Sequence, residues 1–117
     1  MPKPKLPAVS SLTTEIELCP GDVALVRLHG KLVAGTTGPL YSKVDALMPE
    51  IQHVVMDLSD LQYMDSMGLG GLVRLYVTAK AAGCTMELKN LSTPIRHLLG
   101  LTRMLNVFPI VGEAAGI

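Results

Sequence analysis

Residues 54–71, VVMDLSDLQYMDSMGLGG, decide the fold of this chain. Residues 54–58 are nearly all apolar, which predicts a strand covered on both faces. Ser66 then lies where the strand passes into a helix, next to Asp65 and before three glycines in four residues. Such a junction exposes backbone N–H groups with little side-chain cover, so it can present a hydroxyl to a macromolecule or accept an anion. The helix is indicated by apolar residues at helical spacing: Leu69, Leu72, Val73 and Tyr76.

The segments before this junction predict two strands and a helix. Residues 15–18 alternate polar and apolar side chains, as a half-buried edge strand does, and residues 23–28 follow as a more central strand. After a flexible connection rich in glycine and threonine, Thr37 or Gly38 is expected to cap a helix that begins at Pro39.

The segments after the junction continue the alternation of helices and strands. The motif helix is expected to stop at Gly83, and residues 85–89 alternate as a strand should. Ser92 or Thr93 is expected to cap a third helix, and residues 107–111 form a last short strand whose proline indicates an edge. The order β-β-α-β-α-β-α-β predicts one α/β domain with a mixed, mostly parallel sheet of four to five strands and about three main helices.

Composition argues against several classes of partner. Ten Lys and Arg residues balance ten Asp and Glu residues and aromatic residues make up only 3%, so we expect no direct binding of nucleic acid or membrane. The N-terminal stretch lacks a signal-like apolar region, and no apolar run approaches the length of a membrane span. Cys19 and Cys84 are expected to be reduced thiols, which favours a cytoplasmic location. A net charge of zero leaves a weak homodimer possible.

The domain is expected to occupy most of the chain. Residues 1–12 are rich in Pro, Lys and Ser and predict a loose N-terminal tail. The folded domain is then expected to span residues 13–112, followed by a short C-terminal tail, 113–117.

Known catalytic motifs fail at this junction. The nucleophile elbow Gly-x-Ser-x-Gly needs glycine where Met64 stands, and the dinucleotide fingerprint needs glycine where Val73 stands. The three histidines lack metal-ligand spacing, so neither a metal nor a cofactor is expected. A triad of Ser66, His97 and Asp65 stays open on sequence alone, yet a carboxylate adjoining the serine is poorly placed to orient a histidine. We therefore predict that the protein is not an enzyme.

Three stretches carry a resemblance to a known family: residues 54–59 (VVMDLS), 63–70 (YMDSMGLG) and 90–96 (NLSTPIR). Through them the chain, from about residue 15 to residue 112, resembles the STAS domain, the fold of bacterial anti-sigma factor antagonists. The resemblance implies a partner that is both a serine kinase and an anti-sigma factor. It also implies that the unmodified protein binds this partner and that the phosphorylated protein does not.

Carried over by position, the resemblance makes Ser66 the phosphate acceptor. Met67 stands where the family often has a second small residue, and residues 30–33 (GKLV) stand where its early loop is often acidic. The resemblance further implies a partner-binding surface around the serine, consisting of Asp65, Met67, Gly68, Leu69 and Gly70, with added contacts from Thr36 and Thr37.

Two other interpretations remain open. Asp65 or Ser66 can serve only as a helix cap, while the glycines only allow the helix to lie close to the sheet. A STAS domain can also regulate a different partner, such as a stress-sensing scaffold or a lipid-transport ATPase.

Overall fold

The structure, a computed structural model, describes residues 11–111 and contains a five-stranded sheet with the strands in sequence order. β1 runs antiparallel to β2, and the remaining neighbours are parallel, so the sheet is mixed and mostly parallel as predicted. The predicted order of strands and helices is confirmed, with one short 3-10 turn, η1, added after the first helix. The elements are β1 (Leu12–Cys19), β2 (Val23–Leu32), α1 (Ala34–Leu47), η1 (Met48–Glu50), β3 (His53–Met64), α2 (Ser66–Ala81), β4 (Thr85–Lys89), α3 (Thr93–Leu101) and β5 (Ile110–Val111).

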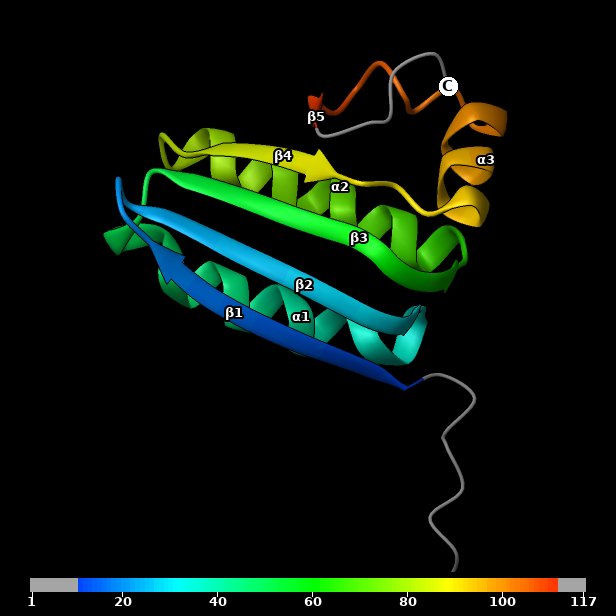
Figure 1. The fold of residues 1–117 in the computed structure, drawn as a ribbon, viewed down its shortest axis with the longest axis horizontal. Coiled ribbons are helices and arrows are strands. Elements are labelled where there is room, and N and C mark those ends of the chain that lie inside the picture. The colour runs from blue at the N-terminus through cyan, green and yellow to red at the C-terminus, as the bar shows by residue number, and fades with distance from the viewer. Residues whose placement is uncertain (1–10, 112–117) are drawn as a thin grey trace, which may run out of the picture.

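The core lies between the sheet and two helices. α1 and α2 lie side by side on one face of the sheet, whereas α3 lies near one end of it (Figure 1). Val54, Met56 and Leu58 of β3 are fully buried, but Val55 and Asp57 between them are only half-buried. The prediction that this strand is covered on both faces is therefore wrong, because α1 and α2 both pack on the same face.

β3 is longer than its apolar run. It continues to Met64, which pairs with Leu32 at the end of β2. The register between the two strands shifts twice on the way, between Arg27 and His29 and again after Gly30. The extension carries the chain to the end of the sheet where α2 starts.

α1 begins at Ala34, so the prediction of a start at Pro39 is wrong, and Pro39 lies inside the helix. Val33 precedes the helix in an extended conformation, and its N–H donates to the Thr36 Oγ1 at 2.9 Å. The Thr36 hydroxyl donates in turn to a carbonyl of β2 at 3.0 Å. Thr36, and not Thr37, therefore closes the first turn directly after the strand.

The other predicted boundaries are close to those observed. α2 ends just before Gly83, which has a φ of +81° and forms the predicted left-handed stop. β4 has the predicted bounds, and α3 follows Ser92 as predicted. The Ser92 hydroxyl does not cap the helix but donates to the Leu61 carbonyl at 2.6 Å, which ties the start of α3 to β3.

The two ends of the described chain form the edges of the sheet. β5 is an edge strand as predicted, but it is shorter than predicted and begins after Pro109. The Pro109 carbonyl still accepts an N–H from β4 at 2.8 Å. At the other edge, β1 begins at Leu12, a residue that was expected in the N-terminal tail. Residues 1–10 and 113–117 of the expected tails lie outside the described residues.

Candidate functional site

The starts of α1, α2 and α3 gather at one end of the sheet, because each helix follows the carboxyl end of a parallel strand (Figure 1). Ser66 is the first residue of α2 and is exposed. Asp65 has extended backbone angles, and its carboxylate accepts the N–H of Gly68 at 2.8 Å. Asp65 is therefore the helix cap. Within residues 11–111 the Ser66 hydroxyl makes no hydrogen bond, so capping does not occupy it.

The three glycines of the motif differ in what surrounds them. A Cβ atom on Gly68 would lie 1.9 Å from the Leu32 carbonyl oxygen, so this position must be glycine for α2 to start against β2. A Cβ atom on Gly71 would lie 2.8 Å from the Thr37 Cγ2 of α1. A Cβ atom on Gly70 would meet nothing within 4 Å. Two glycines thus permit close packing, and the third faces open space.

The predicted partner-binding residues divide into exposed and buried ones. Met67 is 60% exposed, while Leu69 is only 8% exposed and belongs to the core. Gly68 is buried and Asp65 is half-buried. Tyr63, at the end of β3, is 51% exposed and was missed by the sequence reasoning. The sequence could have indicated this exposure, because Tyr63 falls on the polar side of an alternating strand, two residues before the helix cap.

The threonines of α1 are engaged within the protein. The Thr36 hydroxyl closes the first turn of its helix, as described above. The Thr37 hydroxyl donates to the Ala34 carbonyl at 3.3 Å, and its methyl group faces Gly71. Both side chains are half-buried. They position α1 beside α2, and their contact with a partner stays a prediction.

The triad left open by the sequence is not assembled in the described structure. His97 is an exposed residue of α3, and across residues 11–111 no hydrogen bond links it to Ser66 or Asp65. The Asp65 carboxylate instead accepts a backbone N–H of its own helix. The same range contains no group of three His, Cys, Asp or Glu side chains that could hold a metal ion.

One charged cluster lies on the sheet face away from α1 and α2. The His29 ring contacts Asp60 Oδ2 through Nδ1 at 2.5 Å and Glu15 Oε1 through Nε2 at 2.8 Å. The hydrogen bond to Asp60, and then the one to Glu15, raises the pKa of His29 above its usual value. Because the three residues belong to β2, β3 and β1, the cluster ties three strands together.

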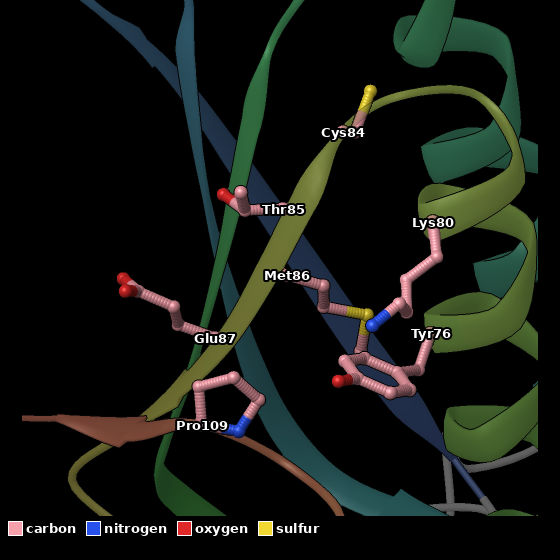
Figure 2. Close-up of a pocket in the computed structure, with 7 residues that line it drawn as sticks. All are labelled: Tyr76, Lys80, Cys84, Thr85, Met86, Glu87 and Pro109. Carbon is pink, nitrogen blue, oxygen red and sulfur yellow. The ribbon is translucent and has the colours of Figure 1, made fainter.

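A cleft of about 330 Å³ lies along the other half of α2 (Figure 2). Tyr76, Lys80 and Met86 lie on one side of β4, and Thr85 and Glu87 lie on the other side. The Lys80 Nζ lies 5.4 Å from the centre of the Tyr76 ring. Tyr76 is ten residues beyond Ser66, about 15 Å along the helix axis. The cleft is therefore separate from the exposed serine. Its lining is Tyr76, Lys80, Cys84, Thr85, Met86, Glu87 and Pro109.

Fold and site together define a small α/β module that presents a serine hydroxyl at the start of a helix, beside exposed apolar side chains. Among the helices of residues 11–111, none is long and apolar enough to cross a membrane. The sequence model of the STAS domain family matches residues 16–114. The chain belongs to this family, which confirms the resemblance drawn from the motifs.

Named relatives and solved structures agree with this assignment. An anti-sigma F factor antagonist of Paenibacillus polymyxa is 30% identical over 90 residues, which cover 75% of this chain and 77% of the relative. An anti-sigma factor antagonist of Mycobacterium paratuberculosis has a similar structure, with a TM-score of 0.78, 25% identity and 92% of each chain covered.

The fold also matches SpoIIAA, an anti-sigma factor antagonist solved in unphosphorylated and phosphorylated forms. The TM-scores are 0.73 and 0.68, and each comparison covers 86% of this chain at 17% identity. The matches cover 90% and 93% of the SpoIIAA chains. At this identity the comparison shows a shared fold.

Proposed function

We propose that this protein is an anti-sigma factor antagonist that is controlled at Ser66. When unmodified, it binds an anti-sigma factor that has serine kinase activity, and phosphorylation of Ser66 ends the binding. The observation that carries the proposal is the exposed Ser66 hydroxyl at the start of α2, left free because Asp65 caps the helix. The protein acts by binding and catalyses no reaction of its own. Its place of action is the cytoplasm, where sigma factors direct transcription.

A phosphate on Ser66 is compatible with the fold. It adds a charge of about −1.5 to −2, and the positive end of the helix dipole favours a negative group in the first turn. Ser66 and Met67 are the first two residues of α2, and the N–H groups of a first helical turn have no carbonyl partner within the helix. These two N–H groups can therefore donate to the phosphate oxygens. Modification therefore leaves the domain folded and changes only its surface.

The same phosphate opposes a docked partner. We take the docking surface to be Ser66 with the exposed residues near it in the sequence, Tyr63, Met67 and Gly70, and the half-buried Asp65. A partner that covers this surface must exclude water from Ser66. A dianion beside the Asp65 carboxylate is then a mispaired buried charge, which costs about 2–5 kcal/mol, or roughly 30-fold to several-thousand-fold in affinity.

The test begins by reading the gene next to the one for this protein. Where that gene encodes an ATP-binding, kinase-like protein, the two proteins are incubated together with ATP. We expect one phosphate on Ser66 by mass spectrometry, none in Ser66→Ala, and weaker capture of the partner by Ser66→Asp. Ser42→Ala is the matched control, because Ser42 is an exposed serine of α1 outside the docking surface. Phosphate at another residue, or equal capture of Ser66→Asp, would refute the switch. If transport proteins are encoded there instead and bind this chain, the alternative of a STAS module for another partner holds.

A further inference from the structure

Gly70 differs from the other two glycines of the motif because nothing packs against it. Gly70 is the fifth residue of α2 and is exposed, and its φ lies outside the left-handed range. A Cβ atom there would meet no heavy atom within 4 Å. Glycine inside a helix is less favourable than alanine because it loses more backbone entropy on folding. Neither packing nor backbone geometry accounts for glycine at this position.

The position of Gly70 relative to Ser66 suggests another reason. Residues four apart lie one above the other on a helix surface. Helical side chains also lean toward the N-terminus, so a residue covers the turn that precedes its own Cα. A side chain at position 70 would therefore lie over the turn that carries Ser66 and Met67. The absence of a side chain leaves the hydroxyl uncovered from that direction.

The next residue along this stripe does not fill the space. Arg74 follows Gly70 by one turn, and its guanidinium carbon lies 4.0 Å from the centre of the Tyr41 ring of α1. Such a cation–π contact holds the long side chain toward α1. The helix surface from Ser66 to Gly70 therefore stays bare backbone, with the exposed Met67 side chain at its margin.

We propose that Gly70 is a specificity-determining residue that keeps Ser66 open to a large macromolecular active site. The proposal rests on the function proposed above. The partner must approach the α2 backbone at position 70 closely in order to reach the hydroxyl. A partner of this kind is a protein kinase surface that fits a flat helix and contacts Met67. A small reagent can reach position 66 without approaching the backbone at position 70. A side chain at position 70 should therefore slow large reagents more than small ones.

The experiment measures access directly and without the partner. Ser66→Cys is made in a Cys19→Ser background, where the remaining thiol of Cys84 is buried. Its reaction rate is measured with a large thiol reagent, the disulfide 5,5′-dithiobis(2-nitrobenzoate), and with a small one, the thiosulfonate methyl methanethiosulfonate. The ratio of the two rates cancels any change in the fraction of thiol present as thiolate, because both reagents react with the thiolate. The ratio is compared among Gly70, Gly70→Ala and Gly70→Leu proteins.

We expect the large-to-small ratio to fall about 2- to 3-fold with alanine and about 10-fold with leucine, because a longer side chain covers more of the preceding turn. Gly38→Leu is the matched control. Gly38 is the fifth residue of α1, and a Cβ atom there also meets nothing within 4 Å. Its ratio should stay at the starting value. An unchanged ratio in Gly70→Leu would overturn the proposal, as would an equal fall in Gly38→Leu.

Failure of the proposed function would look different. If the kinase-like partner leaves Ser66 unmodified in the unaltered protein, the phosphorylation switch fails, while the thiol ratio still decides whether Gly70 controls access. Where the partner does phosphorylate Ser66, the rate should fall in Gly70→Leu and stay unchanged in Gly38→Leu. Thermal unfolding of each variant shows that the domain remains folded, and Gly70→Ala should melt a few degrees higher.

Discussion

Replacing Gly68 by alanine should destabilise the protein severely, although the same change two residues later should stabilise it. The added methyl group would lie 1.9 Å from the Leu32 carbonyl oxygen and 2.9 Å from the Met64 Cγ, whereas Cβ atoms essentially never approach within 3.0 Å. The obstacle is mainly backbone, so rotating a side chain cannot remove it. The start of α2 must move away from the end of β2 by more than 1 Å.

This movement has a cost that can be divided into parts. Overpacking of a tight site costs about 1–3 kcal/mol. The N–H of Asp65 donates to the same Leu32 carbonyl at 3.3 Å, and losing a hydrogen bond costs about 0.5–1.5 kcal/mol. Alanine returns up to about 1 kcal/mol through its better helix propensity. The midpoints of these terms give an expected net loss of about 2 kcal/mol for Gly68→Ala.

Urea unfolding followed by far-UV circular dichroism measures this difference. Gly70→Ala is the matched control, and it should gain about 0.5–1 kcal/mol, because its methyl group enters open space. The two variants carry the same substitution in the same helix, so propensity alone predicts the same sign for both. A Gly68→Ala protein as stable as the unaltered one would refute the close approach of α2 to β2.

Two further predictions concern the contacts that hold the site in place. Gly71→Ala should lose about 1–2 kcal/mol, because its methyl group meets the Thr37 Cγ2 at 2.8 Å, and Thr37→Ala should recover most of the loss in the double variant. Urea unfolding of the four proteins checks this; additive losses would contradict a direct clash. His29, whose pKa is raised by Asp60 and Glu15, stabilises the fold when protonated, so this contribution is full below its unfolded pKa and is lost as the pH rises through the folded pKa. His29→Gln should therefore lose more stability relative to the unaltered protein at about pH 6 than at about pH 8.5, and a pH-independent difference would count against the cluster.

Much of the fold could be predicted because its signals are local. Alternating side chains marked β4 within its observed bounds, and the Asp-Ser-x-Gly element marked the start of α2. The start of α1 could not be predicted in this way. It depends on a hydrogen bond from Thr36 back to β2, and that bond forms only when the strand and the helix meet at the required angle.

In the candidate site, too, local features could be predicted and features that depend on tertiary contacts could not. The motif identified Ser66 and its neighbours, but it placed Leu69 and Met67 together on one surface. In the structure Leu69 turns into the core and Met67 turns to solvent, because α2 has one face against the sheet. Tyr63 is exposed at the end of the sheet where α2 starts only because β3 extends past its apolar run.

Short-range patterns of polar and apolar residues were enough to specify the order of strands and helices and the serine between β3 and α2. Such patterns show which side chains face the core at the repeat of a strand or a helix, and each one extends over only a few neighbouring residues. The distinct roles of Gly68, Gly70 and Gly71 followed only from the packed arrangement. Gly68 lies against Leu32 of β2 and Gly71 against Thr37 of α1, both more than 30 residues earlier in the chain, whereas a Cβ atom on Gly70 would meet nothing within 4 Å.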